Sequence, residues 1–209
     1  FINKLLSVTD KKYLKNLTFY KKNLKQRNKL ILEKTDYHHV EVWDESLSFF
    51  AEKIWKKRKK FINHFVNIFD KLWKSALPEI VGQISYKPSC YSRKQFLDDL
   101  KKKFPKDSQR GQTSVGPQKD LISFSLDDKD IKNQASQGEK KFFLTILKLA
   151  EAEYIEYISG KKPALLLDDL FAKLDKERGE RILRKIEDSF QAFITTTDTS
   201  AGAYFKNPK

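Results

Sequence analysis

The sequence predicts an α/β lobe that follows an α-helical arm, and two patterns of apolar residues carry this prediction. Through residues 1–80 the apolar positions recur every three or four residues, which is the period of an amphipathic helix. From Ile80 onward they form short runs divided by turn residues, a pattern typical of layered α/β folds. We therefore expect an arm domain over residues 1–80 and an α/β domain over residues 81–209.

The arm is expected to be an antiparallel helical hairpin. Its first helix should span residues 10–34, with Asp10 as the N-cap. Its second helix should run for about 35 residues from near Trp43 and end before Pro78. A helix of this length without internal breakers favours an antiparallel partner, and the preceding helix is the available one.

The α/β domain is expected to contain four strands and three helices. The strands should span residues 83–86, 121–126, 164–168 and 192–196, and the helices residues 92–104, 138–159 and 176–190. Ser92 and Asp175 are suitable N-caps, and Gly160 is a suitable C-terminal stop. Residues 105–117 have no period and should form a loop.

Charge and cysteine content narrow the class of protein. With 42 Lys and Arg against 28 Asp and Glu the formal net charge is +14, and residues 1–80 hold 18 of the basic and 9 of the acidic side chains. This excess favours a polyanionic partner, with nucleic acid the first candidate. Cys90 is the single cysteine, so the chain alone cannot build a disulfide framework or a thiolate zinc site.

Membrane and metal signals are weak in the sequence. No apolar run approaches the roughly 20 residues of a membrane span, so we expect a soluble, cytoplasmic protein with no membrane partner. His38, His39 and His64 lack partners at metal-ligand spacing. The sequence contains no methionine, and we expect it to start inside a longer protein.

The first motif is an apolar run over residues 163–167 that ends in the adjacent carboxylates of Asp168 and Asp169. A strand here would place them at the carboxyl edge of a sheet, where ligands bind in open α/β folds. One carboxylate can hold Mg²⁺ while its neighbour orients a nucleophilic water, the two tasks that phosphoanhydride hydrolysis requires. A strand followed by an ordinary acidic turn would have the same sequence pattern.

The second motif is a polar turn just before the helix expected at residues 138–159. Its residues are Ser136, Gln137, Gly138 and Glu139. Ser136 can cap the helix and leave exposed amides at its start pointing toward an anion, which is a phosphate-binding geometry. Ser136 and Glu139 also have the spacing of a plain capping box.

The order of these motifs is more informative than either motif alone. A polar turn, a long helix, a strand ending in Asp168 and then residues 171–175 follow one another, and here the chain resembles the ATP-binding cassettes (ABC) of SMC-like proteins. Further matches lie in residues 5–28, 115–120, 147–153 and 193–198, and on these the chain resembles the RecF family of bacterial recombination mediators. The resemblance implies an α/β fold, the C-terminal lobe of an ABC/SMC-like P-loop ATPase head, plus an α-helical arm.

The resemblance also implies roles for the candidate residues. Asp168 would hold Mg²⁺ in the Walker B position, and Asp169 stands in the place of the catalytic base, where ABC enzymes usually carry the longer Glu. Asp175 matches the D-loop aspartate. Asp198 matches the switch histidine of many cassettes, whose proton donation an acid cannot reproduce. The implied cofactors are ATP and Mg²⁺, and the ATP-binding residues would also include Ser136, Gln137, Gly138 and Glu139.

A Walker A motif is the missing part. Residues 111–116 have its spacing, but Pro117 and Gln118 follow where Lys and Ser or Thr must bind phosphate and Mg²⁺. This chain alone should therefore not hydrolyse ATP. The resemblance places the Walker A before the arm and implies an ATP-dependent homodimer, in which the Ser136 turn of one copy meets the nucleotide of the other.

A basic run is expected on the second arm helix, between Trp55 and Phe61. Its members are Lys56, Lys57, Arg58, Lys59 and Lys60. Phosphate contact would give DNA binding that weakens steeply with salt, while a solvated helix face is the alternative. Trp43, Trp55 and Trp73 lie on or near the apolar stripe and should pack in the core.

The resemblance implies a protein of DNA replication and repair. It would bind duplex DNA beside a single-stranded gap, at single-strand/duplex junctions, and help load recombinase together with RecO and RecR. One alternative is another SMC-like DNA-repair head, which would carry a far longer coiled coil. The other is a non-catalytic module that binds DNA or a protein partner, which the absence of a Walker A upstream of Phe1 would indicate.

Overall fold

The computed structural model describes residues 1–168 and 176–195, and the chain divides into two compact units. The first unit combines Phe1–Ile62 with Tyr86–Ile122, and the second combines Asn63–Ser85 with Ser123–Lys209. This division differs from the expected boundary at residue 80. The reason is that one helix runs through the boundary, while residues 86–122 pack with the arm helices.

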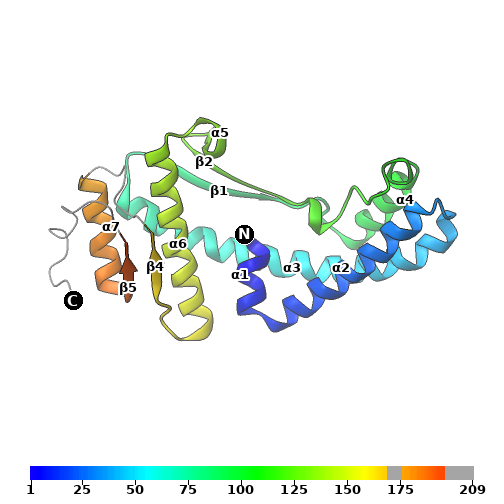
Figure 1. Cartoon of the computed structure of the whole chain (residues 1–209), viewed down its shortest axis with the longest axis horizontal. Coiled ribbons are helices and arrows are strands. Elements are labelled where there is room, and N and C mark those ends of the chain that lie inside the picture. The colour runs from blue at the N-terminus through cyan, green and yellow to red at the C-terminus, as the bar shows by residue number, and fades with distance from the viewer. Residues whose placement is uncertain (169–175, 196–209) are drawn as a thin grey trace. The chain divides into compact units, whose positions relative to one another are not determined.

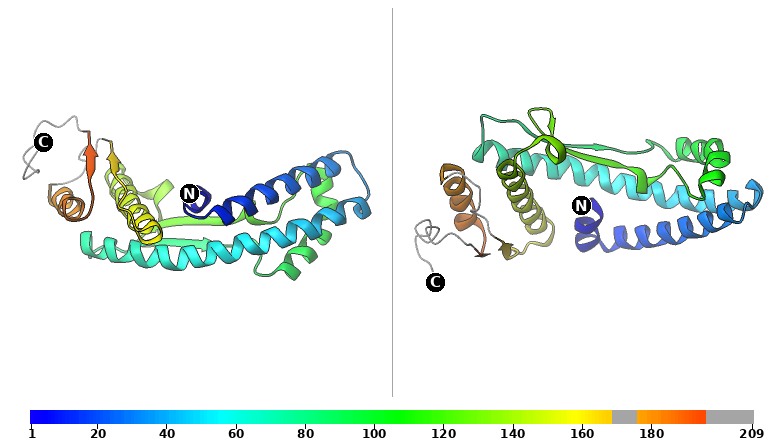
Figure 2. Two further views of the ribbon diagram at one scale, coloured as in Figure 1. Left: turned by 90° about the horizontal axis from the view of Figure 1, so that it is seen from below. Right: turned by 45° about the horizontal axis from the view of Figure 1, so that its top comes forward.

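Helices form most of the first unit. They are α1 (Ile2–Thr9), α2 (Lys11–Leu32), the first part of α3 (Tyr37–Ala76), α4 (Arg93–Arg110) and the 3₁₀ turn η1 (Pro117–Lys119). Figures 1 and 2 show α2 and α3 running side by side. The Phe19 ring stacks on that of Phe50, with centroids 5.3 Å apart, and Asn23 Nδ2 donates to Ser46 Oγ at 2.6 Å. The expected antiparallel hairpin is confirmed.

The start of the hairpin is fixed by Asp10. Its side chain accepts a hydrogen bond from the Tyr13 amide at 2.9 Å, which satisfies one of the free N–H groups at the start of α2. Partial burial acts to raise the pKa of Asp10, but the Lys57 ammonium 2.6 Å away and the hydrogen bonds from backbone amides together hold that pKa below its ordinary value. The sequence did not predict α1, the short helix before this cap.

Helix α4 is longer than expected, because it continues past Pro105 to Arg110. The loop expected from residue 105 was therefore wrong at its start. Asp107 is fully buried and accepts from the Ser114 amide at 3.1 Å, which fixes the last turn against the loop that follows. Gly111, with φ 66°, ends the helix in the left-handed conformation that glycine tolerates. Tertiary contacts thus outweigh the helix-breaking tendency of proline.

The second unit contains the rest of α3 and a small aromatic core. The Phe69 and Trp73 rings stack with centroids 5.5 Å apart, and the Phe143 ring lies 4.9 Å from that of Phe69. The remaining elements of the chain are β1 (Gly82–Lys87), β2 (Leu121–Leu126), β3 (Lys129–Asp130), α5 (Ile131–Gln134), α6 (Gln137–Ser159), β4 (Leu165–Leu167), α7 (Lys176–Ser189) and β5 (Ala192–Ile194). The four expected strands and three expected helices are present in the described residues, and β3 and α5, like α1, were not predicted.

The strands of the described residues form two small sheets. One has the order β1-β2-β3, and the other is the parallel pair of β4 and β5. In the parallel pair Leu165 lies opposite Ala192 and Leu167 opposite Ile194. The carboxyl ends of both strands therefore meet at one edge. None of the described helices is long and apolar enough to span a bilayer.

Candidate nucleotide and DNA sites

Asp168 lies at the carboxyl edge of the parallel pair, directly after β4. Because Leu167 and Ile194 are register partners, Thr195 leaves β5 at the same edge. The Thr195 hydroxyl donates to Asp168 Oδ1, and the Thr195 amide donates to the Leu167 carbonyl at 3.0 Å. The carboxylate of Asp168 is exposed. Within the described residues, this edge thus carries an exposed carboxylate and a hydroxyl oxygen, the ligand type that Mg²⁺ prefers.

The other predicted carboxylates at this edge are not described by the structure. Asp169, Asp175 and Asp198 all lie outside the described residues. Within the described residues, no cluster of three or more His, Cys, Asp or Glu side chains could hold a metal ion. The sequence motif predicts a site at Asp168 but gives no signal for Thr195, which the strand register brings beside it.

The Ser136 turn forms the capping box that its spacing allowed. Ser136 Oγ accepts from the Glu139 amide at 3.2 Å, and Glu139 Oε2 accepts from the Ser136 amide at 2.8 Å. The side chains of Ser136 and Gln137 are exposed, and Gly138 is half-buried. The amides of Gln137 and Gly138 donate to no acceptor in the part of the chain that the structure describes. Capping and anion binding are therefore compatible here, because the box uses different amides.

The loop with Walker A spacing is bound to other parts of the first unit instead. Three of its amides donate to side chains: Thr113 to Asn28 Oδ1 at 2.9 Å, Ser114 to Asp107 at 3.1 Å and Gly116 to Ser89 Oγ at 3.1 Å. A P-loop needs free backbone amides around the phosphates. These amides are already paired, so the loop has no phosphate cradle.

The structure divides the basic run on α3 into two kinds of residue. Lys56, Lys57, Lys59 and Lys60 are exposed. Lys56 pairs with Glu52 at 2.9 Å, four residues earlier on the same helix. Arg58 is only 4% exposed and its guanidinium is paired inside the protein. Its inclusion among the DNA-binding residues was wrong, while the four lysines remain a prediction.

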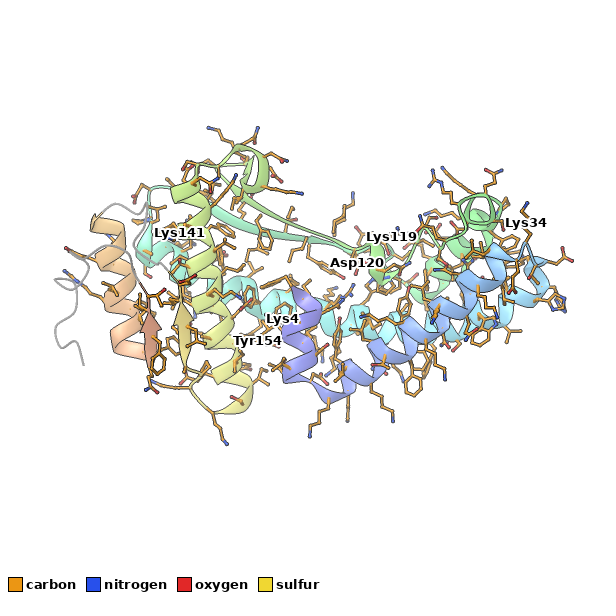
Figure 3. All side chains as sticks on the ribbon, viewed as in Figure 1. Lys4, Lys34, Lys119, Asp120, Lys141 and Tyr154 are labelled. Carbon is orange, nitrogen blue, oxygen red and sulfur yellow. The ribbon has the colours of Figure 1, made fainter. Side chains whose placement is uncertain are left out.

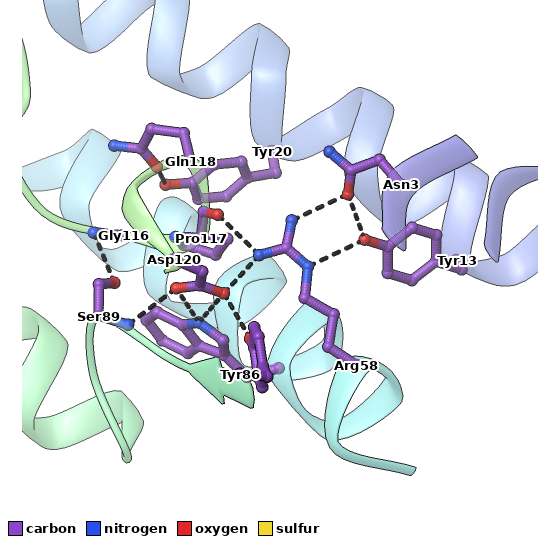
Figure 4. A network of polar contacts seen from close by, with 11 residues as sticks. Asn3, Tyr13, Tyr20, Arg58, Tyr86, Ser89, Gly116, Pro117, Gln118 and Asp120 are labelled. Atoms are coloured by element: carbon purple, nitrogen blue, oxygen red, sulfur yellow. Dashed lines mark hydrogen bonds and ion pairs between the residues drawn. The ribbon is translucent and has the colours of Figure 1, made fainter. Parts of the chain in front are cut away.

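Arg58 is the centre of a buried polar network that the sequence did not predict (Figure 4). Its Nε donates to Tyr13 Oη at 3.1 Å, its Nη1 donates to the Pro117 carbonyl at 2.7 Å, and its Nη2 donates to Asn3 Oδ1 at 2.9 Å. It also pairs with Asp120. One guanidinium therefore ties α1, α2 and α3 to the turn at η1.

Asp120, labelled in Figures 3 and 4, accepts hydrogen bonds from three further residues. Trp55 Nε1 donates to it at 3.0 Å, the Ser89 amide at 2.8 Å and Tyr86 Oη at 2.5 Å. Burial raises the pKa of Tyr86, and the hydrogen bond to Asp120 raises it further. The burial of Trp55, and that of Trp73 in the second unit, matches the core packing expected for them.

The sequence of this chain is similar to those of known proteins. The chain is 33% identical over 218 residues to the DNA replication and repair protein RecF of Chloroherpeton thalassium, a match that covers 95% of this chain and 58% of the relative. It is 36% identical over 205 residues to the RecF protein of Flavobacterium johnsoniae, with 94% and 57% covered. No protein-family model matches.

Solved structures of proteins with the same name are also similar to this chain. A structure described as the recombination mediator protein RecF with ATP, in the RecFOR pathway, superposes with a TM-score of 0.81 at 28% identity. The match covers 95% of this chain and 56% of that chain. The chain thus spans a little more than half the length of the relatives and structures that it matches.

Proposed function

The chain belongs to the RecF family, and from that premise we propose that it forms part of an ATP-dependent DNA-binding protein of replication and repair. The observation that carries this proposal is the meeting of Asp168 and Thr195 at the carboxyl edge of β4 and β5. It supplies acidic and hydroxyl oxygens where an α/β fold binds nucleotides.

ATP and Mg²⁺ fit the chemistry of this edge. Asp168 is the proposed Mg²⁺ ligand, and the Thr195 hydroxyl holds its carboxylate in place. When bound, the metal would neutralise charge that develops on the phosphate oxygens. We assign Asp169 as the group that orients the attacking water, and Asp175 and Asp198 as further residues near the nucleotide. An aspartate reaches one methylene less far than the usual glutamate, so slow hydrolysis is expected.

The phosphate cradle is proposed to lie outside this chain. The loop at residues 111–116 has its amides paired, and the chain spans about 57% of the first relatives' length. We therefore propose that the remainder of the protein supplies the Walker A. The Ser136 turn, with the open amides of Gln137 and Gly138, is proposed to contact the γ-phosphate held by a second copy. ATP would then hold a homodimer together.

DNA is the proposed partner of the basic arm. Lys56, Lys57, Lys59 and Lys60 are proposed to contact backbone phosphates without reading sequence. At the level of the pathway we propose binding of duplex beside a single-stranded gap and assistance in recombinase loading with RecO and RecR. Charge reversal at Lys59 and Lys60 should weaken DNA binding and flatten its salt dependence, and unchanged binding would remove this assignment.

The nucleotide site is tested by Asp168→Asn in the intact protein. Removing this carboxylate charge should lower the ATP hydrolysis rate by about 100-fold or more, since mutation of a residue that only hydrogen-bonds to a metal ligand already lowers metal affinity or activity by roughly 10- to 100-fold. The matched control is Asp128→Asn, which removes the same charge from an exposed turn where Asn tolerates the positive φ of 63°. Hydrolysis at the wild-type rate in Asp168→Asn would contradict the assignment.

The role of Asp169 needs a separate variant. Asp169→Asn keeps the size of the side chain and removes its ability to accept a proton. Turnover should fall while ATP binding, measured by equilibrium titration, stays close to wild type. Unchanged turnover would remove Asp169 from the catalytic step.

A further inference from the structure

Helix α2 carries a straight row of lysines on the side that faces away from the core. We name this row the lysine stripe, and its members are Lys11, Lys15, Lys22, Lys25 and Lys29. At 3.6 residues per turn all five fall within about 40° of one line along the helix. The buried residues of α2, which include Tyr13, Tyr20 and Ile31, lie on the opposite side. The stripe lies in sequence between Lys4 and Lys34, both labelled in Figure 3.

The charge of this stripe is not balanced by its own helix. Over 22 residues α2 contains seven lysines and one arginine but no acidic residue. All five stripe lysines are exposed, and Lys29 alone among them has an ion pair in the described part of the chain, 3.7 Å from Glu33. By contrast, Lys56 and Lys57 on α3 are each paired with a carboxylate. The stripe is therefore a surface of single sign, and holding it without a counter-charge costs free energy.

We propose that the lysine stripe binds the phosphate backbone of duplex DNA. This inference rests on the proposed function, because it assumes that the intact protein binds DNA, and it adds a surface separate from the basic run on α3. The five lysines extend over about 27 Å, which is the length of roughly eight base pairs of B-form DNA. Lysine binds phosphates as a point charge and contributes position rather than base readout.

The side chains of the lysine stripe favour DNA over a protein as its partner. The line of the stripe carries only lysines and Thr18, with no apolar or aromatic side chain on it. Protein interfaces are built around apolar and aromatic anchors and are depleted of lysine, so an acidic protein surface would find little to bury here. Single-stranded binding would need aromatic platforms for the bases. The nearby Phe19 ring already stacks on Phe50, which leaves the duplex backbone as the matching ligand.

The stripe meets the basic run of α3 at the start of the hairpin. Lys57 of α3 pairs with Asp10 at 2.6 Å, and Asp10 immediately precedes Lys11, the first member of the stripe. Lys57 thus lies beside the start of α2, where the stripe begins, and the proposal is that one duplex contacts both groups of lysines.

The test compares two double variants of one helix in the intact protein. Lys15→Gln/Lys22→Gln neutralises two stripe lysines, and Lys12→Gln/Lys21→Gln neutralises two exposed lysines roughly a quarter turn to either side. Both variants lose the same charge from the same helix, and Gln retains helix propensity. Affinity for a labelled duplex is measured by anisotropy between about 50 and 200 mM salt with ATP present.

The stripe variant should bind the duplex roughly tenfold more weakly, and its plot of log K against log salt should be shallower by about 1.8. The flanking variant should keep the wild-type slope. Equal slopes in the two variants would overturn the proposal that the stripe binds DNA. If charge reversal at Lys59 and Lys60 still weakened binding, the proposed function would stand. A wild-type protein that binds no duplex would overturn both.

Discussion

Arg58 is buried although the four lysines beside it in the sequence are exposed, and the helical phase of α3 explains the difference. It lies three residues after Trp55 and three before Phe61, both of which face the interior. A cation at such a position must find buried acceptors, and Asp120 with the Pro117 carbonyl supplies them. The position of each residue relative to the apolar side of the helix therefore decides whether it is buried or exposed, even within a run of like charges.

Removal of the Arg58 charge should destabilise the fold strongly. Arg58→Gln leaves Asp120 buried without its cation, and we expect a loss of about 3–5 kcal/mol in unfolding free energy, measured by urea titration. Lys59→Gln, an exposed neighbour, should change it by less than about 0.5 kcal/mol.

A double-variant cycle separates the pair from general packing. Adding Asp120→Asn to Arg58→Gln removes both charges, so the combined loss should be smaller than the sum of the two single losses. Strict additivity would show that Arg58 and Asp120 do not stabilise one another.

Cys90 should be a slow nucleophile in the folded protein. Its side chain is fully buried, and burial first and the Asp99 carboxylate second raise the pKa of its thiol to about 11. Since only the thiolate reacts, native protein at pH 8 should react with an aromatic disulfide reagent far more slowly than protein unfolded in guanidinium. Equal rates in the two states would contradict this environment.

At the scale of elements, the sequence predicted those structures whose signals are local. The N-caps at Asp10, Ser92 and Ser136 and the C-terminal glycine at Gly160 all occupy the expected positions. The continuation of α4 past Pro105 could not be foreseen, because it depends on Asp107 and its contacts with distant residues. Likewise, the pairing of Asp168 with Thr195 depends on the register of two strands that are separate in the sequence.

Ser136 should have separable structural and functional roles. Ser136→Ala removes the cap of α6 and should cost about 1 kcal/mol of stability, whereas Ser136→Asp keeps an acceptor at the cap and should cost little. A carboxylate there would repel the γ-phosphate of ATP. Because the cap is kept, the unfolding temperature of Ser136→Asp should be close to that of the wild type. A large loss of stability in this variant would show that the turn tolerates no other cap.

At the scale of the whole molecule, the sequence predicted the family from the order of its motifs. Neither the Ser136 turn nor the Asp168 strand end was decisive alone, since each also forms a common structural element. The division into units was harder to foresee. Residues 86–122 belong with the arm because Arg58 and Arg27 hold Asp120 and Asp107, and no local pattern in the sequence reports such long-range ion pairs.

The proposed homodimer, in which ATP joins two copies through the Ser136 turn, is tested directly by the mass of the intact protein in solution. In sedimentation velocity with ATP and Mg²⁺ the wild type should form a dimer that disperses when ATP is withdrawn. Ser136→Arg, which places a long side chain at the exposed turn, should remain a monomer under both conditions. A wild type that does not change mass with ATP, or a Ser136→Arg variant that still dimerises, would contradict the proposed dimer.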